Sequence, residues 1–501
     1  MRILLIHPDN RRRLLVGSYS IDPLGLEYIA ASLTHSGHQV KILSSIQFSH
    51  SSIEKELSIF SPDIVGFSVY TFTVDLSLEI AKFIKEKWPH MKIVFGGYHP
   101  TACPTIVESQ FIDFVVCGEG EDAFRDLVNF FEEGKTDFDS IRGVFYWDNR
   151  LKGVRSRKRV NFASLPPPLR CEKLLESNKV RQIIYPSISK QRSVAQVTYS
   201  RGCPYNCQFC SSRLMFPGGV LWRHPSDVVR ELEELSSNFG VNLVFFSDLT
   251  FNASKRKVHA LCDEMIKASL CIKWCTLCRI DKMDKELLSH MKEAGCVKIS
   301  YGIETVSEPT STSIKYHSTY DKQKFLDIIT LTSKACLLVR GLFILGFPGD
   351  NLESIEELTD FVIESDLDDI RISFCAPFPG TELYSKCKDS GIITSNNFSD
   401  FSTEKPVIAL QDNLHKKLSE ARRDIIRKFY SSEKYKTHYL DRVRKEPFLK
   451  DSYVEYFYLL RERRFITNNI FRDLVVNRDV KLCADIDAKV MSETESEQKM
   501  R

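Results

Sequence analysis

The sequence has no long apolar run, little net charge and no recognisable leader, and each absence excludes a class of protein. No stretch reaches the ~18 uninterrupted apolar residues that a membrane span needs, and the most apolar one, residues 337–347, contains Arg340. The apolar run at residues 1–8 is too short for a signal peptide. The formal charge of +3 gives no basis for expecting a nucleic-acid partner. We therefore expect a cytoplasmic protein without a membrane span.

Disulfides are also not expected, although the chain of 501 residues has fifteen cysteines. A large protein without a secretory signal keeps its thiols reduced and available to bind metals. Three of them, Cys203, Cys207 and Cys210, are spaced C-x3-C-x2-C after an alternating, strand-like run at residues 195–200. Three thiolates on one loop would hold three irons of a four-iron cluster and leave the fourth open to another ligand. The alternatives are a structural zinc site, which needs four ligands, or buried free thiols.

This loop resembles the cluster loop of the radical S-adenosylmethionine (SAM) superfamily, C-x3-C-x-aromatic-C, with Phe209 as the aromatic residue. The resemblance implies that Cys203, Cys207 and Cys210 bind a [4Fe-4S] cluster. It also implies that the open iron chelates SAM, that one electron cleaves SAM to a 5′-deoxyadenosyl radical, and that Phe209 lies beside the adenine.

Residues 1–140 alternate between strand-like and helix-like segments. Near-continuous apolar strands between amphipathic helices predict a doubly wound, Rossmann-like domain, in which a parallel sheet is covered on both faces. The expected strands are residues 2–6, 40–43, 64–69, 92–95 and 114–116, and the expected helices are residues 25–35, 52–60, 76–87 and 122–131.

The loops at the carboxyl ends of these strands carry glycines, which allow positive φ angles and close approach of the backbone to a ligand. Ahead of a radical SAM loop, this order resembles the cobalamin-binding domain of one large radical SAM class. The resemblance places the lower face and nucleotide tail of cobalamin near four residues and puts two more on the rim: Ser68, Tyr70, Gly96 and Gly97, then Gly118 and Glu119.

The chain departs from many cobalamin proteins after its first strand. Those proteins supply a lower axial histidine from Asp-x-His-x-x-Gly, whereas here Asp9 is followed by Asn10 and then by Arg11 in place of the histidine. We therefore expect no axial histidine from this loop. His7 and His99 stand near strand ends and are interpreted as packing residues.

The rest of the chain divides into a linker, a second α/β domain and a helical end. Residues 141–195 contain a hairpin at residues 144–154 and a semi-rigid proline run. Residues 196–390 match the partial (β/α)6 barrel of the radical SAM core. Residues 391–490 are predicted to be mostly helical, with the middle of this region packed over the barrel mouth, and residues 491–501 to form a disordered tail.

Polar residues and a glycine follow the expected strands of the second domain, where the radical SAM fold holds SAM. The resemblance assigns SAM contacts to Asp248, Arg279, Ser300, Glu304 and Gly346, in addition to Phe209. A helix N-cap is the alternative for Asp248, and a simple ion pair is the alternative for Arg279. The sequence assigns no catalytic acid or base.

A second C-x3-C-x2-C occurs at Cys271, Cys275 and Cys278. It has no glycine or proline to make a cluster loop and is typical of a barrel strand. Side chains alternate along a strand, so Cys271 and Cys275 should share one face and Cys278 the other. We interpret all three as buried free thiols, and a second metal centre is the alternative.

The resemblance covers residues 1–390 and implies a cobalamin-dependent radical SAM enzyme that methylates an unactivated carbon of a small molecule. A radical oxidative cyclase or rearrangement enzyme without methyl transfer, like the anaerobic magnesium-protoporphyrin ester cyclases, is one alternative. A non-catalytic cobalamin or redox sensor is another. Either enzyme needs a low-potential electron donor such as flavodoxin or ferredoxin.

Overall fold

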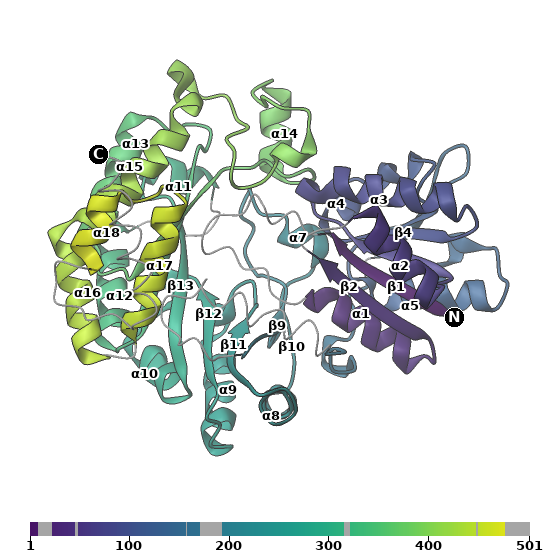
Figure 1. Cartoon of the computed structure of the whole chain (residues 1–501), viewed down its shortest axis with the longest axis horizontal. Helices are drawn as coiled ribbons and strands as arrows, with labels where there is room; N and C mark the ends of the chain where they lie inside the picture. The colour runs from purple at the N-terminus through teal and green to yellow at the C-terminus, as the bar shows by residue number, and fades with distance from the viewer. Residues whose placement is uncertain are drawn as a thin grey trace, which may run out of the picture.

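A computed structural model describes residues 1–8, 23–45, 49–156, 158–170, 193–314, 321–446 and 449–475. Two α/β domains lie side by side, and a group of helices packs on the far side of the second domain (Figure 1). The residues that replace the axial-histidine motif, much of the predicted linker and the predicted tail fall outside the described residues. Among the helices of the described ranges, none is both long and apolar enough to cross a membrane.

The first domain is a seven-stranded sheet in the order β2-β1-β3-β4-β5-β6-β7. Pairing is parallel from β2 to β5, as the alternating pattern predicted, and antiparallel for the last two strands. Its strands are β1 (Arg2–Pro8), β2 (Gln39–Ser45), β3 (Ile64–Ser68), β4 (Lys92–Gly96), β5 (Phe114–Val116), β6 (Val144–Trp147) and β7 (Leu151–Gly153).

The helices of this domain bury apolar faces against both sides of the sheet, which confirms the predicted layers. Side chains of α1 and α5 pack in one apolar core, and those of α2 and α3 pack in the other. Their bounds are α1 (Leu24–His35), α2 (His50–Phe60), α3 (Val74–Lys87), α4 (Tyr98–Ala102) and α5 (Gly120–Glu132).

The predicted hairpin is present, but it does not belong to a linker. β6 pairs with β5 and thereby extends the first sheet, so this domain continues beyond residue 140 to β7. The reason is that Val144 and Phe145 are apolar and are buried against the edge of the sheet, at 0% and 6% exposure.

The second domain is the predicted open, all-parallel barrel of six strands in the order β15-β14-β13-β12-β11-β8. Each crossover carries at least one helix on the outside. The strands are β8 (Ser193–Val197), β11 (Val241–Phe246), β12 (Lys273–Cys278), β13 (Cys296–Glu304), β14 (Leu338–Leu345) and β15 (Asp369–Phe374), and the main outer helices are α8 (Pro225–Phe239), α9 (Lys255–Lys267), α10 (Lys285–Glu293), α12 (Lys322–Lys334) and α13 (Leu352–Glu364).

The last three C-terminal helices pack on the outside of the barrel, on the side away from the first domain (Figure 1), so the prediction that this region packs over the barrel mouth was wrong for them. The first C-terminal helix does begin at the mouth, because Leu418 would lie 2.8 Å from a Cβ on Gly346, at the carboxyl end of β14. The C-terminal helices share one large apolar core with the outer barrel helices. These helices are α15 (Leu418–Ser431), α16 (Glu433–Lys445), α17 (Lys450–Glu462) and α18 (Asn468–Val475).

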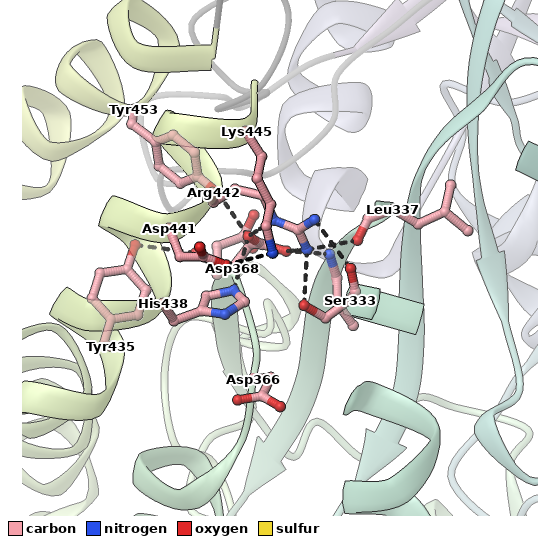
Figure 2. A network of polar contacts seen from close by, with 12 residues as sticks. Ser333, Leu337, Asp366, Asp368, Tyr435, His438, Asp441, Arg442, Lys445 and Tyr453 are labelled. Carbon is pink, nitrogen blue, oxygen red and sulfur yellow. Dashed lines mark hydrogen bonds and ion pairs between the residues drawn. The ribbon is translucent and has the colours of Figure 1, made fainter. Parts of the chain in front are cut away.

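A buried carboxylate explains where these helices attach. Asp368 immediately precedes β15 and accepts hydrogen bonds from Arg442 Nε at 3.1 Å, His438 Nε2 at 3.1 Å and Tyr453 Oη at 2.7 Å (Figure 2). Burial raises the pKa of Asp368, but Arg442 and His438 outweigh it and hold this pKa below its usual range. This attachment of α16 and α17 therefore lies at the amino ends of the strands, opposite the end where ligands of such barrels bind.

Candidate active site

A cavity of about 630 Å³ lies at the carboxyl ends of the first sheet. It includes the ends of β1 and β3, between which the strand order reverses, and such a switch point is where open α/β sheets bind ligands. The cavity brings together all six residues that the sequence assigned to cobalamin, namely Ser68, Tyr70, Gly96, Gly97, Gly118 and Glu119.

The second domain supplies the opposite wall of this cavity. Gln196 at the end of β8, Ser247 after β11 and Arg371 on β15 all line it. Gly202 lines it too, and the next residue is Cys203. The cavity therefore reaches the residue before the cysteine loop, although the three cysteines themselves do not line it.

Stacked aromatic rings form part of the wall on the side of the first domain. Tyr70 stacks on Phe72 and on Tyr98, with ring centroids 5.7 Å apart in each case. His7 packs edge-on against Tyr70 at 6.1 Å. The sequence singled out Tyr70 but missed Tyr98, although Tyr98 directly follows the Gly-Gly pair at the carboxyl end of β4. A flat aromatic layer beside glycine backbone suits a large, mostly apolar ring system such as a corrin.

Gly97 shows why this loop needs glycine. Its φ of +101° lies in the region that side-chain-bearing residues avoid, and a Cβ there would lie 2.9 Å from the backbone N and O of Val69. The backbone of Gly97 therefore approaches the neighbouring loop at Val69 rather than a ligand. This contact brings the carboxyl ends of β3 and β4 together beside the cavity.

The cysteine loop lies between two short strand segments. β9 (Ser200–Arg201) pairs antiparallel with β10 (Leu221–Trp222), which fixes the chain just before Cys203. Gly202 has a φ of +106°, and a Cβ there would collide with the backbone oxygen of Gly219. The backbone N–H of Cys210 donates to the carbonyl of Cys207 at 3.1 Å, which closes the loop into a turn.

The donors on this loop fit a cluster by their chemistry. Cys203, Cys207 and Cys210 are free cysteines that are half-buried or exposed, and three thiolates can each bind a different iron of a [4Fe-4S] cluster. Within the ranges that the structure describes, no three His, Cys, Asp or Glu side chains form a group that could hold one metal ion.

Asp248 faces the start of this loop rather than open space. It is 1% exposed, and its carboxylate accepts hydrogen bonds from the backbone N–H of Tyr199 at 3.1 Å and of Ser200 at 2.5 Å. Burial raises the pKa of Asp248 to about 6. Asp248 thus fixes the turn that leads to Cys203, and its direct contact with SAM stays a prediction.

Arg279 forms the ion pair that was the alternative for it, but it also contacts the cysteine loop. Its guanidinium donates to both oxygens of Asp281, at 2.9 and 3.0 Å. The same group lies 3.9 Å from the ring centroid of Tyr205, between Cys203 and Cys207. The loop is therefore clamped from the end of β12.

Glu304 ends β13 with a φ of +69°, which is costly for a residue with a side chain and is typical of functional sites. Its carboxylate interacts electrostatically with Cys210. Ser300, on the same strand, is buried.

Gly346 follows β14 with a φ of +91°. Asp350 holds the Gly346 turn by accepting from the N–H groups of Gly346 at 2.8 Å and Phe347 at 3.1 Å. The ring of Phe209 packs edge-on against Phe347 at 5.5 Å. Phe209, Glu304 and Gly346 are thus placed around one end of the barrel, as predicted from the strand ends, and their contacts with SAM stay predictions.

The second cysteine motif does not form a loop. Cys275 packs with Val194, Leu243 and Phe245, whereas Cys278 belongs to the large outer core, so these two point to opposite faces of β12. Cys271 precedes the strand and is exposed, so the interpretation that it is buried was wrong. Ser269, Leu270 and Cys271 lie in the turn between α9 and β12, where the chain is at the surface.

Sequence reasoning missed the ion pairs that join the two domains beside the cavity. Arg201 Nη1 lies 2.6 Å from Glu121 Oε1 and 3.3 Å from Glu119 Oε1, and all three side chains are buried. Arg159 also pairs with Glu119. The alternation of glycine and glutamate at residues 118–121 was the only feature of the sequence that pointed to these ion pairs. We used it in part when we assigned Glu119 to the rim of the cobalamin site.

Comparison with known proteins agrees with this architecture. The B12 binding domain family matches residues 14–128, and the Radical SAM superfamily matches residues 197–362. Two domains that carry a cobalamin-binding sheet and a radical SAM core define the class of cobalamin-dependent radical SAM enzymes.

An uncharacterized methyltransferase of Pyrococcus horikoshii is 31% identical over 86% of this chain and 92% of its own length. An anaerobic magnesium-protoporphyrin IX monomethyl ester cyclase of Cereibacter sphaeroides is 25% identical over 86% of this chain and 70% of its own length. The chain therefore belongs to the cobalamin-dependent radical SAM family of methyltransferases and their cyclase-like relatives. It is a radical SAM enzyme whose cofactors are a [4Fe-4S] cluster, SAM and cobalamin.

Solved structures share the fold at low identity. The radical SAM methyltransferase TsrM from Kitasatospora setae superposes with a TM-score of 0.65 at 17% identity, over 80% of this chain and 84% of its own. The cobalamin-dependent radical SAM enzyme OxsB superposes with a TM-score of 0.68 at 16% identity, over 94% of this chain and 74% of its own.

Proposed function

We propose that this enzyme transfers a methyl group to an unactivated carbon of a small-molecule substrate. The observation that carries the proposal is the shared cavity, because residues at the carboxyl ends of the first sheet and residues of the barrel line one space that extends to Gly202, next to Cys203. A methyl donor held against the first domain would thereby face a radical generated in the second. SAM and cobalamin supply the radical and methyl-transfer chemistry when they are bound.

In this proposal the protein itself binds and orients the cofactors, and it excludes water from them. Cys203, Cys207 and Cys210 hold the cluster, while Gly202 and the pair of β9 with β10 fix their loop. Tyr70 and Tyr98 offer a flat wall to the cobalamin. The proposal needs no side chain to act as an acid or base.

The first test is anaerobic reconstitution of the full chain, followed by measurement of iron, cobalamin and 5′-deoxyadenosine. We expect about four irons per chain in the wild type and loss of both iron and SAM cleavage in Cys203→Ala/Cys207→Ala/Cys210→Ala. Cobalamin should remain bound in this triple variant, because its cavity residues are unchanged. Bound iron without cobalamin would overturn the assignment of the cavity.

Cys271→Ser is the matched control for the triple variant. Cys271 is exposed and precedes β12, so its replacement should leave the iron content and SAM cleavage of the wild type unchanged. About eight irons in the wild type, falling to about four in Cys271→Ser, would instead reveal a second cluster at the second cysteine motif.

A radical cyclisation or rearrangement without methyl transfer is the second candidate, and the identity to the cyclase of Cereibacter sphaeroides favours it. SAM labelled in its methyl group separates the two without knowledge of the substrate. Under reducing conditions a methyltransferase should pass the label to its bound cobalamin, whereas a cyclase should form 5′-deoxyadenosine and leave the cobalamin unlabelled.

The proposal includes a low-potential electron donor, such as flavodoxin or ferredoxin, in the cytoplasm. Reductive cleavage of SAM consumes one electron, which we propose that an external donor protein supplies. Reconstituted enzyme with SAM and reduced flavodoxin should release 5′-deoxyadenosine, and oxidised flavodoxin should not support the reaction.

A further inference from the structure

Two hydroxyl groups contact two of the three loop cysteines. Thr250 Oγ1 lies 3.3 Å from Cys203 Sγ, and Ser212 Oγ lies 3.2 Å from Cys210 Sγ. Both hydroxyl residues are buried, with exposures of 4% for Thr250 and 5% for Ser212. Packing around these buried side chains restricts their movement, so both hydroxyl groups stay next to the cysteine loop.

The chain places these hydroxyls from two different directions. Thr250 follows β11, two residues after Asp248, so one short segment holds the turn before the loop through Asp248 and touches Cys203 through Thr250. Ser212 opens α7 (Ser212–Met215) and reaches back to Cys210. The first and last cysteines of the motif therefore each have a hydroxyl group within hydrogen-bonding distance.

The direction of each hydrogen bond follows from the chemistry of a metal ligand. A cysteine that binds iron is a thiolate without a proton, so the hydroxyl must be the donor. The Thr250 hydroxyl has a second acceptor, the carbonyl of Leu249 at 2.8 Å. A charged sulfur is the stronger acceptor, because charge-assisted hydrogen bonds are about twice as strong as neutral ones.

Hydrogen bonds to ligating sulfurs change the reduction potential of a cluster. Reduction adds one electron and no proton, so the reduced cluster and its thiolates carry one more negative charge. A donor that points at a ligating sulfur stabilises this form and raises the reduction potential. Removing the donor should make the cluster harder to reduce.

We propose that Thr250 and Ser212 are positioning residues that raise the reduction potential of the cluster by donating hydrogen bonds to Cys203 and Cys210. The inference rests on the proposed role of these cysteines as iron ligands. It assigns a function to two residues that do not need to touch SAM, cobalamin or substrate.

The test is a redox titration of the reconstituted full-length enzyme without SAM, followed by the electron paramagnetic resonance signal of the reduced cluster. Thr250→Val keeps the shape of the side chain and removes the donor, so its midpoint potential should fall below that of the wild type. Thr250→Ser keeps the donor, so its midpoint potential should equal that of the wild type. Ser212→Ala should also lower the midpoint potential, and the double variant Thr250→Val/Ser212→Ala should have the lowest value. Thr359→Val is the control, because it removes a buried hydroxyl that bonds only within α13.

The iron content separates failure of this inference from failure of the site assignment. A wild type without iron would overturn the assignment of the cysteines. Full iron content with the same potential in Thr250→Val, Ser212→Ala and the wild type would overturn the role of the hydroxyls alone.

If Thr250→Val retains too little cluster to titrate, Ser212→Ala and pulsed resonance spectra after exchange into D2O decide the question. The wild type should show a deuteron coupling that Ser212→Ala lacks. Identical spectra in these two proteins would overturn the proposal.

Discussion

The guanidinium of Arg201 lies 2.6 Å from Glu121 Oε1, which joins the strand before the cysteine loop to the first turn of α5 in the other domain. Arg201 also lies over the ring of Phe162 at 4.5 Å and over that of Tyr28 at 5.0 Å. This buried contact stands two residues before Cys203. The position of the cysteine loop and the docking of the two domains are therefore fixed by the same side chain.

Replacing Arg201 by methionine should destabilise the protein and loosen its hold on cobalamin. The change leaves Glu121 buried without its cation, and breaking a buried ion pair in this way costs about 3–5 kcal/mol. Denaturant unfolding and cobalamin retention on gel filtration measure the two effects. Arg230→Met removes an exposed pair with Asp227 and should change stability by less than about 1 kcal/mol. Equal stability of the two variants would contradict the role of Arg201.

A second prediction concerns the loop after β4. Gly97→Ala should reduce cobalamin binding, because alanine is strained at a φ of +101° and its Cβ would press on Val69. The strain costs about 1–3 kcal/mol. Gly134→Ala is the matched control: Gly134 also has a positive φ, but a Cβ there would meet nothing within 4 Å. Cobalamin titrations followed by absorbance should show weaker binding for Gly97→Ala alone, and unaltered binding would show that the loop does not shape the site.

The sequence predicted well what depends on local pattern. The segments expected as strands at residues 64–69 and 92–95 are β3 and β4, because apolar runs of this length between amphipathic helices pack in a parallel sheet. The six residues assigned to cobalamin share one cavity for the same reason, since carboxyl ends of parallel strands meet at one edge.

Contacts between distant segments could not be predicted in this way. Nothing near Asp368 in the sequence indicates that Arg442 and Tyr453 bind it, so the attachment of α16 and α17 at the amino ends of the strands was not predicted. Thr250 likewise has no local pattern that marks it as a neighbour of Cys203. Such pairs follow from tertiary packing, which periodicity along the chain does not encode.

The Gly346 turn should make stability depend on pH. Burial raises the pKa of Asp350 from 3.8 to about 6, despite the hydrogen bonds from Gly346, Phe347 and Thr310 that oppose the shift. A carboxyl with a raised pKa in the folded state contributes full stability below the unfolded pKa and loses it as pH rises through the folded value.

Between pH ~4 and ~6 the unfolding free energy of the wild type should therefore fall by up to about 3 kcal/mol more than that of Asp350→Asn. Asparagine keeps an acceptor for both N–H groups but does not titrate. Denaturant unfolding at several pH values measures the difference. Parallel pH profiles for the two proteins would show that Asp350 has the same pKa in both states.

The last prediction is that the attachment of the C-terminal helices contributes to stability but not to SAM cleavage. Arg442 Nη2 donates to the carbonyl of Leu337 at 2.9 Å and to Asp368 at 3.2 Å, so one side chain ties α16 to the amino ends of β14 and β15 (Figure 2). Arg442→Met would leave Asp368 buried with less opposing charge, and we expect a loss of about 3–5 kcal/mol in the free energy of unfolding.

Lys445→Met removes an exposed pair with Asp441 on the same helix and should cost less than about 1 kcal/mol. Because the Asp368 network lies at the end of the barrel opposite the cysteine loop, 5′-deoxyadenosine formed per bound cluster should be equal in Arg442→Met, Lys445→Met and the wild type. If Arg442→Met instead lost SAM cleavage while its stability stayed unchanged, the C-terminal helices would act on the active site, and their attachment at the amino ends of the strands would not be their main function.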